Sequence, residues 1–189
     1  MPGSFLSKLT SSLHESLMEI WVLIIILEFI FASFMVWIAW SSAIGAPWVP
    51  TPRKKARIML ELAEVGPQDI VYDIGSGDGR IVTMAAKEFG AKSVGIEMDP
   101  LRVLWSRISI RRQGLAPTSK ILRENFFKSN IEDATVVTVY QGVEVNKKLK
   151  EKFSRELKPG TRVVSYRFRF KGWTPVRTND ETSSFLYIV

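Results

Sequence analysis

The sequence predicts an α/β fold built on a doubly wound, mostly parallel sheet, with one transmembrane helix ahead of it. Three observations carry this expectation. After Pro52 the chain alternates between helical and strand patterns, a glycine-rich turn follows the first strand, and residues 20–40 form a long apolar run. We therefore expect four parts: an N-terminal segment (1–18), a transmembrane helix (19–41), a proline-rich linker (42–52) and an α/β domain (53–189).

The apolar run "IWVLIIILEFIFASFMVWIAW" at residues 20–40 contains a single charge, Glu28. As a helix its 21 residues would extend roughly 31 Å, the thickness of a hydrocarbon core. Its 13 Ile, Leu, Phe and Val residues contribute roughly −4 to −8 kcal/mol to insertion, which exceeds the cost of about 3 kcal/mol for one central acid. Trp21, Trp37 and Trp40 fit the aromatic belts of the two interfaces.

Two alternatives compete with a membrane anchor. A cleaved signal peptide would need a basic segment before a shorter apolar core, whereas the flank before residue 20 is acidic on balance. A buried core helix of this length would need more domain surface than the chain supplies. Four bases follow the run in "PRKKAR" (52–57) and only Lys8 precedes it, so the positive-inside rule predicts a single-pass membrane protein with its α/β domain on the cytoplasmic side. Glu28 is expected to be protonated in lipid or paired with a partner helix.

The linker and the domain are marked by turn residues and by hydrophobic periodicity. Gly45, Pro47, Pro50 and Pro52 predict an extended linker, and a first helix follows it. Further helices are expected at 80–89, 100–112 and 144–157, and strands at 69–75, 93–98, 119–125, 134–140, 161–168 and 183–189.

The composition excludes several kinds of chemistry. The chain has no cysteine and one histidine, His14, so we expect no metal site, no cysteine nucleophile and no Ser-His-Asp triad. Residues 1–50 carry one base and three acids, whereas residues 51–189 carry 25 bases and 16 acids, a net charge of +9. Such an excess suits a nucleic acid, an anionic membrane surface or an acidic protein, and it is equally compatible with a solvated surface.

The stretch "VYDIGSGDGRI" (71–81) places a glycine-rich turn between a strand and a helix, where α/β sheets bind nucleotide-like ligands. No Gly-Lys-Ser/Thr follows, which excludes a phosphate-binding loop. A dinucleotide is the main competitor, but Asp73 and Asp78 would repel its pyrophosphate, and the glycine spacing is G-x-G-x-G. S-adenosylmethionine carries a sulfonium and an ammonium and no phosphate, so two carboxylates at the turn suit it. A turn that merely closes a βα unit is the remaining alternative.

Two more side chains extend this site along the expected sheet edge. Glu97 ends the second strand, from which a carboxylate can accept both ribose hydroxyls. Asn125 ends the third strand, where its amide could reach the adenine. The expected cofactor-binding residues are therefore Asp73, Gly75, Ser76, Gly77, Asp78, Gly79, Glu97 and Asn125.

The motifs "YDIGSGDGR" and "GIEMDP" resemble those of class I, Rossmann-like S-adenosylmethionine-dependent methyltransferases. Together with "PWVPTP", "RELKPGTRVVS" and "FRFKGWTP", they resemble a small family of protein lysine methyltransferases. That family includes archaeal broad-specificity enzymes and eukaryotic mitochondrial enzymes that modify the c-ring protein of ATP synthase. The resemblance runs from Pro47 to the C terminus and implies cofactor contacts at the motif positions, a protein lysine as acceptor and, by analogy, an acceptor that is itself a membrane protein.

A lysine acceptor must lose a proton before it can attack, and no histidine is present to take it. We therefore expect desolvation and positioning to dominate the reaction. Tyr140, Ser165 and Trp173, at or after the ends of strands four and five, are the expected lining of the lysine channel, with core packing as the alternative for the two aromatic residues.

Two other functions remain open at this stage. RNA or DNA methylation would use the net positive charge, but no Asn/Asp-Pro-Pro-aromatic turn follows strand four, and C5 chemistry on a pyrimidine needs a cysteine. A membrane-tethered adaptor that binds the cofactor without catalysis is the third possibility.

Overall fold

The computed structural model describes residues 3–44 and 49–189, which form two units, Met1–Gly45 and Ala46–Val189. The first unit is one helix, α1 (Gly3–Ile44), so the backbone has no break between the expected N-terminal segment and the expected transmembrane helix. Gly45, Pro47 and Trp48 of the expected linker, and the side chain of Trp40, lie outside the described residues.

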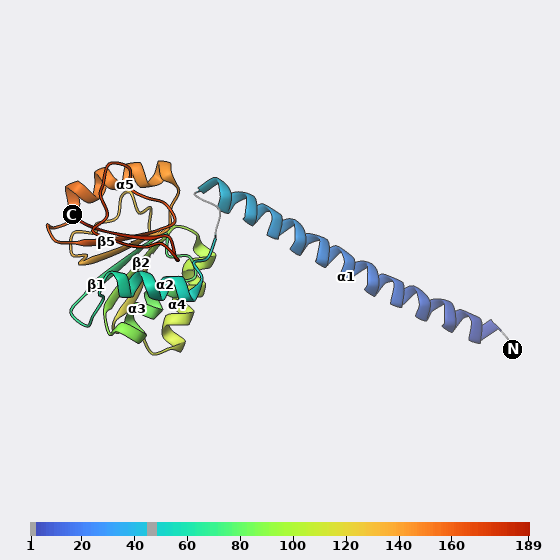
Figure 1. The fold of residues 1–189 in the computed structure, drawn as a ribbon. Helices are drawn as coiled ribbons and strands as arrows, with labels where there is room; N and C mark the ends of the chain where they lie inside the picture. Colours follow the sequence, from blue (N-terminus) through green and yellow to red (C-terminus); the bar gives the residue numbers. More distant parts are fainter. Residues whose placement is uncertain (1–2, 45–48) are drawn as a thin grey trace. The chain divides into compact units, whose positions relative to one another are not determined.

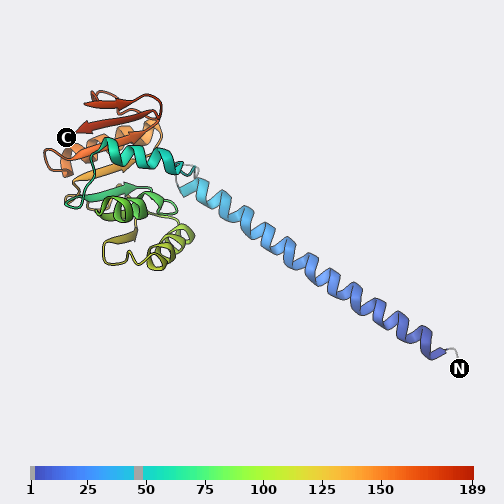
Figure 2. The ribbon, with the colours of Figure 1, turned by 60° about the horizontal axis from the view of Figure 1, so that its bottom comes forward.

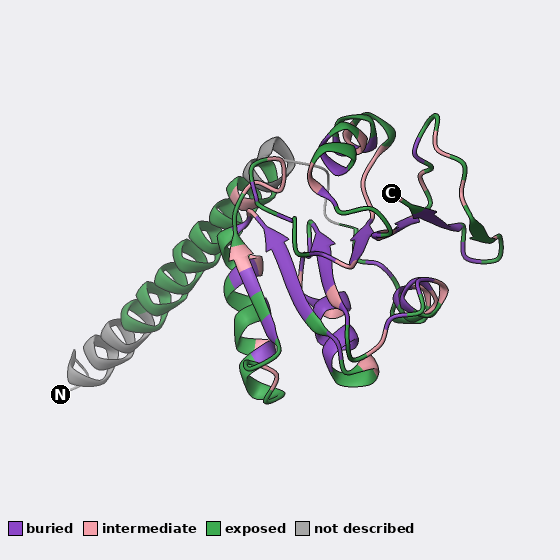
Figure 3. Cartoon of the chain, turned by 90° about the vertical axis from the view of Figure 1, so that its left-hand side faces the viewer, coloured by how far each residue is buried: buried purple, intermediate pink, exposed green. Residues whose placement is uncertain are grey.

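Helix α1 contains a stretch, His14–Ala39, that is long and apolar enough to cross a membrane, with a mean hydropathy of 2.6. Its described side chains are exposed along almost the whole stretch, as the green colour in Figure 3 shows. Core helices of soluble proteins and signal sequences can have the same length and hydropathy. On these two properties the stretch is therefore a candidate membrane span.

The second unit is an α/β domain with a seven-stranded sheet in the order β3-β2-β1-β4-β5-β7-β6. Strands β1 to β5 are parallel, whereas β7 is antiparallel to both β5 and β6. The order reverses between β1 and β4, and sheets of this kind bind ligands at the carboxyl ends of the strands beside such a switch point. The strands are β1 (Ile70–Ile74), β2 (Lys92–Glu97), β3 (Ser119–Arg123), β4 (Val136–Val139), β5 (Arg162–Tyr166), β6 (Arg177–Asn179) and β7 (Ser184–Ile188).

Helices cover both faces of the sheet because side chains alternate between faces along each strand. One face packs against α2 (Arg53–Leu62), α3 (Arg80–Phe89) and α4 (Pro100–Arg112), through residues such as Val71 and Val164 (Figure 1). The other face packs against α5 (Val143–Glu156), with Ile74, Val137 and Phe153 in one cluster. The sequence therefore predicted the layered architecture correctly.

The predicted and observed elements differ mainly at the C-terminal edge. Helices 80–89 and 100–112 have the predicted bounds, and the other elements agree to within a few residues. Strand β6 was not predicted; it is short and pairs with β7 at the edge of the sheet, at the red end of the colour scale in Figure 2. An edge strand of three polar residues, Arg177–Asn179, has no hydrophobic alternation that would reveal it.

Candidate functional site

The turn after β1 adopts a backbone that only glycine adopts readily. Gly75, Gly77 and Gly79 have φ values of 75°, 55° and 75°. A Cβ at Gly75 would also collide with the side-chain amide of Gln141, and one at Gly79 would lie 3.0 Å from Cβ of Ser106. These three glycines therefore let the chain turn at the switch point of the sheet.

The turn is fastened to β2 through its own backbone N–H groups. Those of Gly75 and Ser76 donate to the carbonyl of Ile96 at 2.9 and 3.0 Å, and that of Gly77 donates to Oε2 of Glu97 at 2.9 Å. Because a phosphate-binding turn needs N–H groups directed at the anion, these internal bonds remove the donors that a pyrophosphate would use.

The N terminus of α3 already holds an anion, the carboxylate of Asp78. This carboxylate accepts from the backbone N–H of Arg80 and forms an ion pair with its guanidinium at 2.5 Å. Arg80 also donates to the carbonyl of Thr51 at 2.8 Å, which ties the start of the domain to the turn. A dinucleotide would have to place its pyrophosphate against Asp78, so the geometry disfavours one.

Asp73 lies at the centre of the site and is buried. Its Oδ1 accepts a hydrogen bond from Oγ1 of Thr138 at 2.7 Å. Burial raises its pKa to about 7; the bond from Thr138 opposes this rise, and the negative charges of Asp78 and Glu97 add to it. The neighbouring carboxylates Asp78 and Glu97 have arginine partners, Arg80 and Arg102, whereas Asp73 forms no ion pair with the described residues. A ligand with positive charge would therefore lower the pKa of Asp73.

Glu97 uses most of its acceptor capacity within the protein. One carboxylate oxygen accepts from Gly77, and the other accepts from the backbone N–H groups of Met98 and Asp99, each at 2.9 Å. A carboxylate offers about four lone-pair positions, and three are used here, so one is left for a ligand. A second would become free only if a ligand displaced one of the backbone donors. The predicted bond to both ribose hydroxyls would require such a displacement, which the sequence did not indicate.

The remaining predicted cofactor residues have defined places in the fold. Asn125 lies two residues after β3, and its Oδ1 accepts from the backbone N–H of Phe127 at 2.9 Å, so its amide NH2 is the group left to face a ligand. The hydroxyl of Ser76 is buried without a hydrogen-bond partner among the described residues and lies against Gly95 of β2.

The three expected catalytic residues have different surroundings. Tyr140 follows β4 and is half-buried. Ser165 is fully buried and donates to the carbonyl of Phe168 at 2.6 Å, so its hydroxyl orders the loop after β5. Trp173 packs against Phe170 and Tyr187, with ring centroids 5.2 and 5.7 Å apart. The lysine-channel assignment remains a prediction for all three.

A different group of aromatic rings lies beside Tyr140. Its ring makes an edge contact with Tyr166 at 4.7 Å and stacks near Phe168 at 6.2 Å, and all three rings are half-buried. Arg167, between the latter two, has φ of 65° and donates to the Tyr140 hydroxyl at 3.4 Å. A left-handed non-glycine residue is uncommon and often marks a functional loop.

Gln141 links this aromatic group to the glycine turn. Its Nε2 donates to the carbonyl of Ile74 at 3.2 Å, immediately before Gly75. Val139 pairs with Ile74 in the sheet, which places Tyr140 next to the turn as well. No pattern in the sequence indicated Gln141. Tyr166 and Phe168 lie in the stretch "SYRFRFKGWTP" that resembles the lysine methyltransferases, but they were not among the residues expected to line the channel.

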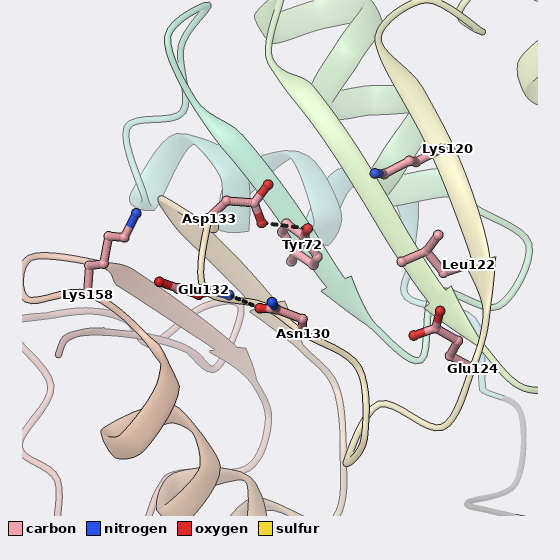
Figure 4. A pocket seen from close by; sticks show the side chains of 8 residues that line it. All are labelled: Tyr72, Lys120, Leu122, Glu124, Asn130, Glu132, Asp133 and Lys158. Atoms are coloured by element: carbon pink, nitrogen blue, oxygen red, sulfur yellow. Dashed lines mark hydrogen bonds between the residues drawn. The ribbon is translucent and has the colours of Figure 1, made fainter.

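A hollow of about 340 Å³ lies elsewhere on the domain and is separate from this site (Figure 4). Its lining includes Lys120 and Leu122 of β3 and Tyr72 of β1, whose hydroxyl donates to Asp133 at 2.6 Å. Burial, followed by the bond to Asp133, raises the pKa of Tyr72. Neither the glycine turn nor Glu97 lines it. The described residues also contain no group of three or more His, Cys, Asp or Glu side chains placed to hold a metal ion.

The sheet order, the glycine turn and the crowded carboxylates together define a class I methyltransferase. Comparison with known proteins supports this. The model of the ANTKMT methyltransferase domain matches residues 73–177. A protein-lysine N-methyltransferase of Saccharolobus islandicus is 44% identical over 76% of this chain and 93% of its own length. A crystal structure described as an RNA methyltransferase of Salinibacter ruber, in complex with S-adenosyl-L-homocysteine, is 42% identical over 75% of this chain and 94% of that chain, with a TM-score of 0.73.

The chain belongs to the ANTKMT methyltransferase family. The adenine nucleotide translocase lysine N-methyltransferase of Mus musculus is another relative, 34% identical over 69% of this chain, which spans 56% of that relative's length. The predicted cofactor, S-adenosylmethionine, is confirmed for the class by the bound product in the Salinibacter structure. The site fits it, because the buried carboxyl of Asp73 forms no ion pair with the described residues and suits a ligand with a sulfonium and an ammonium.

Proposed function

We propose that this protein methylates lysine side chains of other proteins. Its similarity to the Saccharolobus lysine methyltransferase, over nearly that protein's whole length, is the observation that carries the proposal. The aromatic group of Tyr140, Tyr166 and Phe168 supports it, because aromatic faces attract ammonium and methylammonium groups.

In this proposal the cofactor lies over the glycine turn. Asp73, Glu97 and Asn125 are the side chains that would hold it, with the backbone of Gly75, Gly77 and Gly79 in close approach. Bound there, S-adenosylmethionine supplies a methyl group activated by its sulfonium charge.

The chain's own task is to present a neutral amine. A free lysine has a pKa of about 10.4, so loss of its proton at pH 7 costs about 4.6 kcal/mol. Exclusion of water from the site and the nearby sulfonium charge would disfavour the charged form of the amine, and the proton would leave to solvent. Nucleophilic attack then depends on alignment by Tyr140 and its neighbours rather than on a general base.

A transfer assay on membrane extracts tests the acceptor class. The purified full chain is incubated with tritiated S-adenosylmethionine, and the products are treated with protease or with ribonuclease. We expect protease-sensitive label that acid hydrolysis releases as methyl-lysine. The likeness to the Salinibacter protein favours RNA as the second candidate, and ribonuclease-sensitive label would replace our proposal with that one.

Two variants test the aromatic group. Replacing Tyr140 by Ala removes a ring and should lower kcat/KM for the protein acceptor by about tenfold, as loss of a desolvated cation–π contact implies. Tyr72→Phe is a control for changing a tyrosine outside the proposed channel, since it removes only the hydroxyl that bonds to Asp133. Equal rates for Tyr140→Ala and the control would eliminate the proposed channel.

We further propose that α1 anchors the protein in a membrane, with the α/β domain on the cytoplasmic side. The candidate span and the bases at the start of α2 support this: Arg53, Lys54, Lys55 and Arg57 follow it. The full chain should stay in the membrane pellet after alkaline carbonate extraction. Release into the supernatant would contradict the anchor.

A further inference from the structure

Helix α4 exposes a stripe of large apolar side chains. Leu101, Leu104, Trp105 and Ile108 have 53%, 57%, 68% and 38% of their surface exposed. They recur at i, i+3, i+4 and i+7, so at 3.6 residues per turn they occupy about 100° of the helix circumference. Contiguous exposed apolar surface of this kind marks an interaction site more often than scattered single residues do.

The stripe does not belong to the core, because α4 already buries its opposite side. Val103, Ser106 and Ile110 are buried on that side and pack the helix onto the sheet. The hydroxyl of Ser106 also donates to the carbonyl of Gly77 at 2.9 Å. The exposed stripe is therefore held rigidly, and α4 is bonded to the cofactor turn itself.

The charges around the stripe are all positive within α4. The helix contains four arginines and no acid. Arg111 and Arg112 lie exposed in its last turn, and neither forms an ion pair with a residue in the described part of the chain. Arg112 falls within the stripe's angular range at its C-terminal end, where a long cationic side chain can extend to an interface.

An apolar stripe with a tryptophan, bordered by arginines, has the chemistry of a helix that lies in a bilayer surface. Anionic headgroups complement the net charge of +9 in residues 51–189. The candidate span in α1 also supplies the tether, since an anchored domain meets its own membrane at high effective concentration.

We infer that α4 docks the methyltransferase domain onto an anionic membrane surface, with Leu101, Leu104, Trp105 and Ile108 inserted among the headgroups and Arg111 and Arg112 on lipid phosphates. This inference rests on the proposed membrane anchor. Because α4 starts directly after Glu97 and Asp99, docking would hold the cofactor site close to the membrane surface and so favour acceptor lysines near it.

Site-specific labelling tests the docking. Because the chain has no cysteine of its own, a thiol-reactive dye will label only the cysteine that is introduced. The full chain is placed one per nanodisc containing phosphatidylcholine and phosphatidylserine, with an environment-sensitive dye on Leu104→Cys. The matched control is Lys148→Cys, exposed on α5 across the sheet. We expect a blue shift of the dye and protection from aqueous iodide at 104 only, both reduced by added salt because screening weakens the arginine contacts.

A second variant separates lipid insertion from other causes. Trp105→Ser should lower the docking equilibrium by roughly tenfold, whereas Val143→Ser, which removes an exposed apolar side chain of α5, should leave it unchanged. A dye at 104 as exposed to iodide as one at 148 would overturn the inference. So would a shift that needs two chains per disc, or one that persists in detergent without a bilayer.

Two measurements on the same samples distinguish this failure from failure of the proposed function. Calorimetry with S-adenosyl-L-homocysteine reports the cofactor site, and carbonate extraction reports the anchor. If both behave as proposed and the dye stays exposed, only the docking of α4 is wrong.

Discussion

Binding of S-adenosylmethionine should release a proton from Asp73. This carboxyl is buried, and its pKa of about 7 follows mainly from burial, with Asp78 and Glu97 adding repulsion. A cationic ligand favours the ionised form, so the ligand and the proton compete. If the Asp73 carboxyl stays ionised in the complex, the dissociation constant should rise about eightfold as the pH falls from 7.5 to 6.0. At pH 6.0 Asp73 is protonated in about nine tenths of the ligand-free protein, and this proton must leave before the ligand binds.

The assay is titration calorimetry at several pH values in buffers of different ionisation enthalpy. It should detect about 0.9 protons released per ligand bound at pH 6.0 and about 0.2 at pH 7.5, by the same linkage. An affinity that is flat over this range, or no buffer dependence, would refute the reasoning. So would an Asp73→Asn variant that binds with the same pH slope as the parent protein.

The ligand-free protein provides an independent reading of the same group. A carboxyl whose pKa is raised on folding binds extra protons in the folded state, so its contribution is most favourable at low pH. That contribution is lost as the pH rises from about 4 to about 7, by up to about 4 kcal/mol. Asp73→Asn keeps the acceptor oxygen for Thr138 and should remove this decline in the free energy of unfolding, measured with urea.

Two further predictions concern stability. Gly95→Ala places a Cβ 2.5 Å from Oγ of Ser76 and should lower the free energy of unfolding by about 1–3 kcal/mol in urea titrations, whereas Gly66→Ala, with open space around it, should change it by less than about 1 kcal/mol. Arg162→Leu leaves the buried Asp69 without its ion-pair partner and should cost about 2–4 kcal/mol by the same measurement. Arg155→Leu breaks an exposed pair and should cost less than about 1 kcal/mol, and equal losses in the two arginine variants would contradict the burial argument.

Local signals made much of the fold predictable. Helix α3 lies between Gly79 and Gly90, both left-handed, and α4 begins at Asp99–Pro100, where the carboxylate caps two backbone N–H groups. Residues of these types mark the ends of helices and can be recognised from the sequence alone. The three-residue strand β6 has no such signal, because its pairing with β7 depends on contacts that only the folded sheet provides.

The hydrogen-bond and ion-pair partners of the site residues could not be predicted from the sequence. The acids at the glycine turn were visible, but their states were not: Asp78 is paired with Arg80, and Glu97 is largely satisfied by backbone N–H groups. The bond from the Ser165 hydroxyl to the carbonyl of Phe168 was not visible either, and its place in the lysine channel stays a prediction. Hydrogen-bond partners are set by tertiary geometry, which residue spacing does not determine.

The exposure of α4 was equally hidden from the sequence. Its apolar residues are distributed around the whole helix, with Val103 and Ile110 on one side and Leu104 and Trp105 on the other. Periodicity alone does not reveal which side the sheet covers. Only the packing of α4 against β3 shows that the larger side chains face outward.

Calorimetry on the purified full chain tests the central claim most directly, which is that the carboxylates of the glycine turn accommodate a cationic methyl donor. We predict that S-adenosylmethionine and S-adenosyl-L-homocysteine each bind one per chain, and that NADH gives no heat. Binding of NADH, with no signal from either methionine derivative, would contradict the account.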